Sequence, residues 1–208
     1  MLDSSLLVFI LTSLLIILSP GQDMVLVLSR SIARSSTAGL VTAAGISSGL
    51  LGHTLLVAAG LGALLQASEL AFSLMKYLGA AYLIYLGFKA FRAPPLSLDS
   101  PVGQSDKLMS LFWQGALSNL ANPKIAIFYF AYLPQFVSPT SDNAAFTLLA
   151  LGTLFAVLTF VVKMPIGLLA GKLSGWIRSR PSVQIWLNRS SGGLLMALGL
   201  RLATDNPA

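Results

Sequence analysis

The sequence predicts an all-α polytopic membrane protein with six transmembrane helices arranged as two inverted repeats of three. Of the 208 residues, 55% are hydrophobic and only 10% are charged, whereas about 25% of the residues of a soluble domain are charged. Six apolar runs have the length of about 20 residues that a helix needs to cross a bilayer. Two of them, the first and the fourth, are broken in their interior, at Pro20 and Pro123.

The apolar runs follow one another closely, so residues 1–208 are expected to form a single transmembrane domain. Asp3 and no Lys or Arg precede the first run, and no small-residue cleavage site follows it, so we interpret it as a mature helix and not as a signal peptide. A polar loop, 93–107, separates repeat one, about 1–92, from repeat two, about 108–208. The expected spans are 6–28, 39–65, 70–91, 108–137, 144–170 and 185–203.

Basic residues fall at alternate connections and predict the orientation of the chain. The other connections carry Glu69 and Asp142 but no Lys or Arg. By the positive-inside rule the basic connections are cytoplasmic, which places both termini outside. Topology therefore accounts for the net charge of +6, and we expect no nucleic-acid partner. Nine of the thirteen basic residues agree with this orientation: Arg30, Arg34, Lys89, Arg92, Lys107, Lys172, Arg178, Arg180 and Arg189.

An internal repeat supports the division into two halves. Pro20 and Pro123 occupy equivalent places in spans one and four, 103 residues apart. The segment 82–89, Tyr-Leu-Ile-Tyr-Leu-Gly-Phe-Lys, resembles 194–201, Leu-Leu-Met-Ala-Leu-Gly-Leu-Arg, at an offset of 112. Since three spans per half is an odd number, the halves must be inverted relative to each other. Chance similarity between leucine-rich segments is the alternative.

The two breaks are the segments Ser19-Pro-Gly-Gln-Asp23 and Asn119-Leu-Ala-Asn-Pro-Lys124. Proline lacks a backbone donor, so carbonyls near residues 119 and 120 are expected to lose their helical partners. Such groups are tolerated in a membrane only where they face protein or a wet cavity. Broken helices in corresponding places of two halves indicate the substrate site of a transporter.

The chemistry of a helix break suits a zwitterion. The N–H groups of a restarted helix favour a carboxylate, and the freed carbonyls before each proline favour an ammonium group. The two breaks together therefore match an amino acid. A proline kink that serves only packing predicts the same residues, and this alternative stays open.

Buried charges mark the residues that could carry function, because a charge near the bilayer centre costs about 2.5–3.5 kcal/mol. For straight helices, Asp23 lies roughly 10 Å to the cytoplasmic side of the midplane with Lys163 at a similar level, whereas Lys124 and His53 lie roughly 6–7 Å to the outer side. We therefore expect Asp23 to pair with Lys163 and not with Lys124. Alternatives are that Asp23 caps the restarted helix, that Lys163 extends to an interface, and that His53 is a packing residue and not a proton carrier.

The inventory of side chains argues against other classes of protein. The chain has no cysteine and one histidine, so thiolate metal sites and disulfides are excluded, and we expect no metal or cofactor. A membrane-embedded enzyme would need clustered nucleophiles, bases or ligands that the sequence does not offer. A channel, or a transporter of another small solute or ion, is the alternative that remains.

The motifs resemble the bacterial lysine exporter and homoserine–threonine resistance family of amino acid exporters over nearly the whole chain. The matching segments are 18–23, Leu-Ser-Pro-Gly-Gln-Asp, 39–65 with His53, 77–87, Tyr-Leu-Gly-Ala-Ala-Tyr-Leu-Ile-Tyr-Leu-Gly, 119–124, Asn-Leu-Ala-Asn-Pro-Lys, and 133–136, Leu-Pro-Gln-Phe. Members often carry Pro-Gly-Pro in span one, where this chain has Gln22 in place of the second proline.

The resemblance implies a carrier of the cytoplasmic membrane that exports amino acids or their derivatives and is driven by protons. We expect the substrate to bind near the midplane between the two breaks, with Asp23 as the proton-coupling or ammonium-binding carboxylate. Small-residue faces allow a homodimer without requiring one. The candidate site residues are Pro20, Gly21, Gln22, Asp23, His53, Asn119, Asn122, Pro123, Lys124 and Lys163.

Overall fold

The computed structural model describes residues 4–18, 21–67, 69–94, 107–137, 143–170, 176 and 179–204. These residues form helices without any β-strand, which confirms the all-α prediction. The elements are α1 (Ser4–Leu18), α2 (Gln22–Ala33), α3 (Ser36–Ala67), α4 (Glu69–Phe91), α5 (Leu108–Leu120), α6 (Pro123–Tyr132), the 3₁₀ helix η1 (Leu133–Phe136), α7 (Ala144–Leu168) and α9 (Pro181–Thr204).

The helices follow the expected apolar runs. In the described part of the chain, two stretches are long and apolar enough to cross a membrane alone, Ser36–Gly60 of α3 and Ala144–Leu168. The pair Ser5–Leu18 and Gln22–Ala33 qualifies together, and its two helices are bent by 53° relative to each other. The first expected span is therefore two helices, and the fourth is also divided, into α5 and α6.

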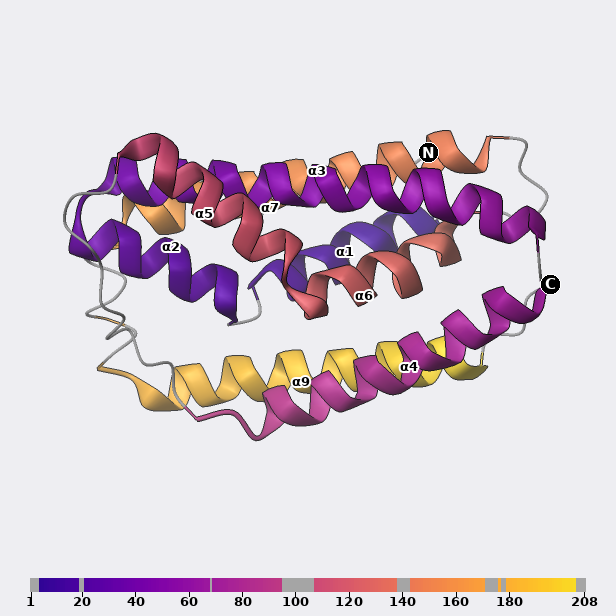
Figure 1. Ribbon diagram of the computed structural model, residues 1–208. Helices are drawn as coiled ribbons and strands as arrows, with labels where there is room; N and C mark the ends of the chain where they lie inside the picture. Colours follow the sequence, from indigo (N-terminus) through magenta and orange to yellow (C-terminus); the bar gives the residue numbers. More distant parts are fainter. Residues whose placement is uncertain are drawn as a thin grey trace.

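Both divided spans meet in the middle of the molecule (Figure 1). Helix α3 runs the length of the protein and packs against α2, α5 and α7. Helices α4 and α9 form a separate antiparallel pair that packs against the rest through α6 and α1. Aromatic side chains of α1, α6 and α7, including Phe9, Phe128, Tyr129 and Phe155, form the most tightly buried part of the core.

Glycines allow α3 and α5 to approach closely. A Cβ on Gly115 of α5 would lie 2.5 Å from the carbonyl oxygen of Thr42, and a Cβ on Gly45 of α3 would collide with the backbone of Phe112. A Cβ on Gly49 would lie 3.0 Å from the side chain of Asn119. Gly45 and Gly49 therefore serve the packing of α3 against α5.

The contact between α4 and α9 also depends on glycines. A Cβ on Gly87 would lie 2.6 Å from the carbonyl oxygen of Gly192 and 2.8 Å from the backbone nitrogen of Met196. A Cβ on Gly199 would lie 2.7 Å from the carbonyl oxygen of Ala80. Each glycine thus lies directly against the backbone of the opposite helix.

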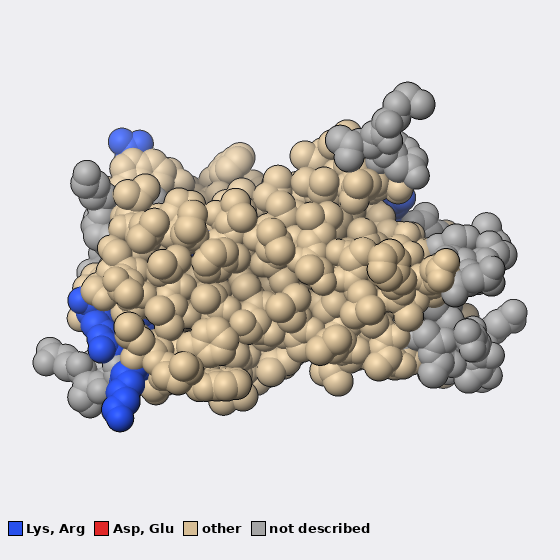
Figure 2. Space-filling model, turned by 90° about the horizontal axis from the view of Figure 1, so that it is seen from above, with Lys and Arg blue, Asp and Glu red and all other residues tan. Residues whose placement is uncertain are grey.

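Charge is concentrated at the ends of the molecule. On the face shown in Figure 2, the described Lys and Arg side chains gather mainly at one end, and the long surface between the ends is uncharged. The exposed residues Arg34, Arg92, Lys107 and Arg180 belong to connections at that end. Ser4 and Thr204, the first and last described residues, lie towards the opposite end (Figure 1).

Candidate functional site

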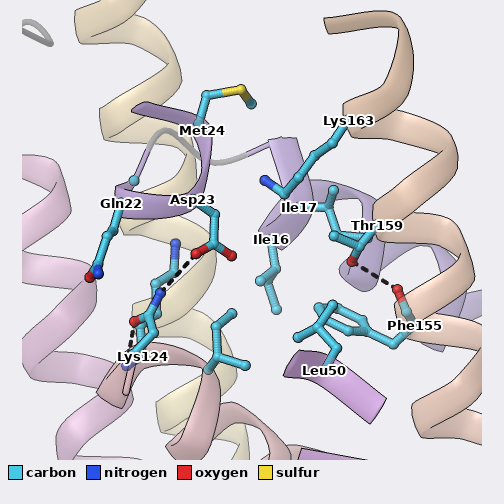
Figure 3. A pocket seen from close by; sticks show the side chains of 13 residues that line it. Ile16, Ile17, Gln22, Asp23, Met24, Leu50, Lys124, Phe155, Thr159 and Lys163 are labelled. Carbon is cyan, nitrogen blue, oxygen red and sulfur yellow. Dashed lines mark hydrogen bonds between the residues drawn. The ribbon is translucent and has the colours of Figure 1, made fainter. Parts of the chain in front are cut away.

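A small cavity lies where the two divided spans meet α3 and α7 (Figure 3). Its volume is about 30 Å³, which admits one or two water molecules and is smaller than any amino acid. One part of its wall is polar and the other is apolar. The lining residues are Ile16, Ile17, Gly21, Gln22, Asp23, Met24, Leu50, Asn122, Lys124, Ile125, Phe155, Thr159 and Lys163.

Asp23, in the first turn of α2, is the carboxylate of this cavity and is only 8% exposed. Its Oδ2 accepts a hydrogen bond of 2.9 Å from Nδ2 of Asn119, and its Oδ1 accepts one of 3.5 Å from Nδ2 of Asn122. Both donors belong to the second break, so hydrogen bonds to the carboxylate join α2 to the end of α5 and the start of α6. Amide donors make burial of the charged form tolerable.

Two lysines line the same cavity from different elements. Lys124 belongs to the first turn of α6, and Lys163 lies on α7 with 3% of its surface exposed. In Figure 3 the amine end of Lys163 extends from α7 toward the side where Asp23 lies. One carboxylate and two ammonium groups therefore surround a site that is apolar elsewhere.

Two details of the expected charge arrangement are different. Asn119 and Asn122 donate hydrogen bonds to the Asp23 carboxylate, and these two partners were not expected, whereas the pairing of Asp23 with Lys163, which lines the same cavity, stays a prediction. The expected separation of Asp23 from Lys124 along the membrane normal is wrong, since both line one cavity. A depth calculated from the rise of a straight helix does not apply where α1 and α2 are bent by 53°.

Asn122 begins helix α6. Its Oδ1 accepts the main-chain N–H of Lys124 at 3.1 Å, and its carbonyl accepts the N–H groups of Ile125 and Ala126. Pro123, at the first helical position, has no N–H to satisfy. The amides at the start of α6 are therefore already paired, and the expectation that they are free to bind a carboxylate is wrong for this helix.

The carbonyl of Asn119 is the one that Pro123 leaves without a helical donor, because the residue four positions later has no N–H. It accepts the N–H of Asn122 at 3.0 Å and faces Nε2 of His53 at 3.2 Å. His53, on α3, therefore takes up the hydrogen bond that the break released. The prediction of a freed carbonyl near residue 119 is confirmed, and its partner is a histidine of another helix.

The predicted site residues divide into three groups. Those that line the cavity are Gly21, Gln22, Asp23, Asn122, Lys124 and Lys163. Asn119 and His53 lie behind Asp23 without lining the cavity, and Pro123 shapes the break from its outer side. Pro20 lies outside the described residues.

Two polar residues were missed by the sequence analysis. Ser118 accepts a hydrogen bond of 2.8 Å from Nε2 of Gln22, a second link between the two breaks. Thr159 lines the cavity one helical turn before Lys163, and its hydroxyl donates to the carbonyl of Phe155. The spacing of four residues between Thr159 and Lys163 was a signal that both lie on one face of α7.

The geometry is that of a binding site between helices. Within the described ranges, no group of three His, Cys, Asp or Glu residues could hold a metal ion. Charged groups of both signs face an enclosed volume where apolar helices are interrupted, which is an arrangement suited to binding a polar solute at membrane depth. Fold and geometry thus define an α-helical membrane protein with a small central cavity that is lined by charged and apolar side chains.

The chain belongs to the LysE type translocator family, whose model matches residues 14–206. It is 36% identical over 200 residues to the homoserine/homoserine lactone efflux protein of Salmonella typhimurium, covering 96% of both chains. It is 34% identical to an uncharacterized membrane protein of Vibrio cholerae, and 26% identical over 197 residues to the leucine efflux protein of Salmonella choleraesuis, with at least 93% of each chain covered. No solved structure matches. The protein is therefore a transporter and not an enzyme.

Proposed function

We propose that the protein is a secondary active exporter of neutral amino acids or their derivatives, driven by proton antiport across the bacterial cytoplasmic membrane. The observation that carries this proposal is that Asp23, Lys124 and Lys163 line one cavity between the two divided spans of a LysE type translocator. The relatives named for homoserine and leucine efflux support amino acid export.

The lining supports a zwitterion with an uncharged side chain. The substrate ammonium binds at Asp23 and its carboxylate binds at Lys124 or Lys163. The side chain then meets the apolar part of the wall, which includes Ile16 and Phe155. Asp23 is the one carboxylate among the lining residues, so a cationic side chain would have no second anion to pair with.

Exchange of a proton for the substrate follows from the single carboxylate. A buried Asp23 is neutralised either by a proton or by the substrate ammonium, and one carboxylate does not hold both. Binding of the amino acid therefore requires release of the proton, and release of the amino acid requires rebinding of a proton. This competition produces antiport without a second ionisable group.

The cavity must open before an amino acid enters, because its volume of about 30 Å³ is too small. We expect one three-helix repeat to rock against the other, with the breaks at Pro20 and Pro123 as hinges. Six spans in two inverted repeats are supported by the contacts of α4 with α9. Gly87 lies against Gly192 and Met196, and Gly199 lies against Ala80 and Ile84.

The sequence repeat has an offset of 112, and this offset converts the contacts of Gly87 into those of Gly199. Adding 112 to residues 80, 84 and 87 gives 192, 196 and 199. Two antiparallel helices often contact at paired positions, but the presence of glycine at both 87 and 199 favours a repeat. Helices α3 and α7 behave similarly at an offset of 113, since Gly39 lies against Gly167 and Gly152 lies against Thr54.

The orientation is also part of the proposal. The end that carries Arg34, Arg92, Lys107 and Arg180 faces the cytoplasm, and both termini lie outside. The bacterial relatives with membrane-protein names support a bacterial membrane as the location. Surrounding lipid and a homodimer remain predictions.

Efflux of labelled homoserine, leucine and lysine from proteoliposomes tests the function. Under an imposed pH gradient we expect the natural protein to export homoserine or leucine in preference to lysine. Asp23→Asn removes both the proton site and the anionic partner of the substrate ammonium, so it should abolish gradient-driven efflux and leave only weak residual substrate exchange. Ser179→Ala, which changes an exposed serine that does not line the cavity, should retain driven efflux.

Three results would contradict the proposal. Driven efflux that is unchanged in Asp23→Asn would remove Asp23 from proton coupling. Rapid flux that neither saturates nor responds to substrate on the opposite side would indicate the alternative, a channel. If none of the tested amino acids moved across the membrane, amino acid export would be ruled out as the function.

A further inference from the structure

His53 is placed to donate one hydrogen bond and nothing more. Its Nε2 lies 3.2 Å from the carbonyl oxygen of Asn119. A carbonyl oxygen only accepts, so Nε2 must carry a proton whatever the state of the rest of the ring. This carbonyl already accepts the N–H of Asn122 at 3.0 Å, and His53 adds a second donor at the place where Pro123 supplies none.

The other ring nitrogen does not connect to the cavity. Nδ1 of His53 is buried and has no hydrogen-bond partner in the described part of the chain, and His53 does not line the cavity. A proton relay needs a group that gives a proton on one side of the ring and a group that takes it on the other. Here one nitrogen faces a carbonyl and the other faces no polar atom, so the ring is not connected as a relay.

The ring is held in place by its neighbours. Tyr129 of α6 packs against it with the ring centroids 5.5 Å apart. The Tyr129 hydroxyl donates to the carbonyl of Gly152 at 3.2 Å and accepts from Thr54 at 3.4 Å, which fixes the tyrosine between α3 and α7. The imidazole is therefore oriented toward Asn119 by packing as well as by its hydrogen bond.

Asn119 links His53 to the carboxylate of Asp23. It is completely buried, and its backbone carbonyl faces His53 while its side-chain Nδ2 donates to Asp23 at 2.9 Å. A shift of the residue 119 backbone would therefore move the donor away from Asp23. Pro123 creates the free carbonyl, His53 fixes it, and Asn119 presents its amide to the cavity carboxylate.

We propose that His53 is a positioning residue, which holds Asn119 through the carbonyl released by Pro123 and thereby sets the geometry of Asp23, and that it does not carry the transported proton. This inference rests on the proposed function only in assigning the coupling role to Asp23. The other ionisable groups that line the cavity with Asp23 are Lys124 and Lys163.

Two amide substitutions separate positioning from proton relay. In His53→Gln the side-chain Nε2 can occupy nearly the place of the imidazole Nε2 and donate to Asn119, whereas Asn is one methylene shorter and does not reach. Neither amide titrates near neutral pH. The two variants are matched in polarity but differ by one methylene group, so a loss of activity larger than the accompanying loss of thermal stability reports the hydrogen bond and not packing.

The first measurement is homoserine efflux from proteoliposomes under a pH gradient. His53→Gln should stay within about threefold of the natural rate with an unchanged pH profile, and His53→Asn should fall by about tenfold with a raised KM. In the Asp23→Asn background, His53→Asn should change substrate exchange by less than about twofold, because its partner is already lost. Loss of driven efflux in both variants with exchange retained would establish a relay and overturn the proposal.

The second measurement is independent of the substrate. A hydrophobic carbodiimide modifies protonated carboxyl groups within membranes, and mass spectrometry reports its rate of reaction at Asp23. At a fixed pH, the labelling rate of Asp23 in His53→Asn should differ from the rate in the natural protein by more than about threefold. The rate in His53→Gln should match that of the natural protein. Equal labelling in all three proteins overturns the positioning role, even if amino acid export itself has failed its own test.

Discussion

Nδ2 of Asn119 on α5 lies 2.9 Å from Oδ2 of Asp23 on α2, so the two divided spans are joined at their breaks by a buried hydrogen bond. The residues are 96 positions apart in the sequence. Each break leaves polar groups that a continuous helix would satisfy internally. Some of these polar groups form hydrogen bonds with the other break, and the remaining polar groups face the cavity.

Asn119→Leu should lower the stability of the folded protein by about 1–3 kcal/mol, because the buried Asp23 carboxylate loses its shorter hydrogen bond. Leucine keeps the branched shape of asparagine but is larger, so overpacking adds to the loss at this fully buried position. Thermal unfolding in detergent, followed by fluorescence-detected size exclusion, measures the difference. In the Asp23→Asn background the loss should be smaller, and an equal loss in both backgrounds would show that Asn119 acts through packing alone.

Gly45→Ala should destabilise the protein by about 1–3 kcal/mol, since the added methyl group collides with the backbone of Phe112 and forces α3 away from α5. Gly60→Ala, on the same helix, is the matched control because no atom lies within 4 Å of the added Cβ. The control should be neutral or stabilised by up to about 1 kcal/mol through helix propensity. Equal melting temperatures for the two variants would contradict the close approach of α3 and α5.

The breaks and most helix boundaries could be predicted from the sequence, because proline and hydrophobic length act locally. Helix α3, Ser36–Ala67, extends the expected span 39–65 by a few residues at each end, and α7 begins at the expected Ala144. The division of span four before Pro123 follows from the missing N–H of proline alone.

The partners of the polar residues could not be predicted, because they depend on the angles between helix segments. A bend of 53° brings Asp23 and Lys124 to one cavity, whereas a straight helix separates them. The hydrogen bond from His53 to the carbonyl of Asn119 also depends on how α3 crosses α5. Sequence periodicity identifies which side chains are buried but not which atoms they meet.

Gly87→Ala and Gly199→Ala should destabilise the protein by similar amounts, about 1–3 kcal/mol each. At both positions a Cβ would lie within 2.7 Å of a carbonyl oxygen of the opposite helix, and the two positions are equivalent under the proposed repeat. Gly193→Ala is the control, because the space around its Cβ is open to 4 Å. Melting temperatures that differ widely between the two variants would count against a symmetric contact of α4 and α9.

The proposed orientation predicts which cysteines react from outside an intact cell. The natural chain contains no cysteine, so a single substitution gives an unambiguous signal. Ser35→Cys lies in the exposed connection between α2 and α3, and Thr204→Cys lies at the exposed end of α9, toward the opposite end of the molecule. If both termini are outside, a membrane-impermeant maleimide should label Thr204→Cys in intact cells and Ser35→Cys only after permeabilisation.

Permeabilised cells provide the internal control, because both cysteines should then react. The reverse pattern in intact cells would invert the orientation and place Arg34 and the other basic connections outside, against the positive-inside rule. Labelling of both cysteines in intact cells would indicate two orientations in one membrane. The charge difference between the two ends is large enough that we expect a single orientation. Labelling of Ser35→Cys should therefore stay at the background level until the membrane is permeabilised.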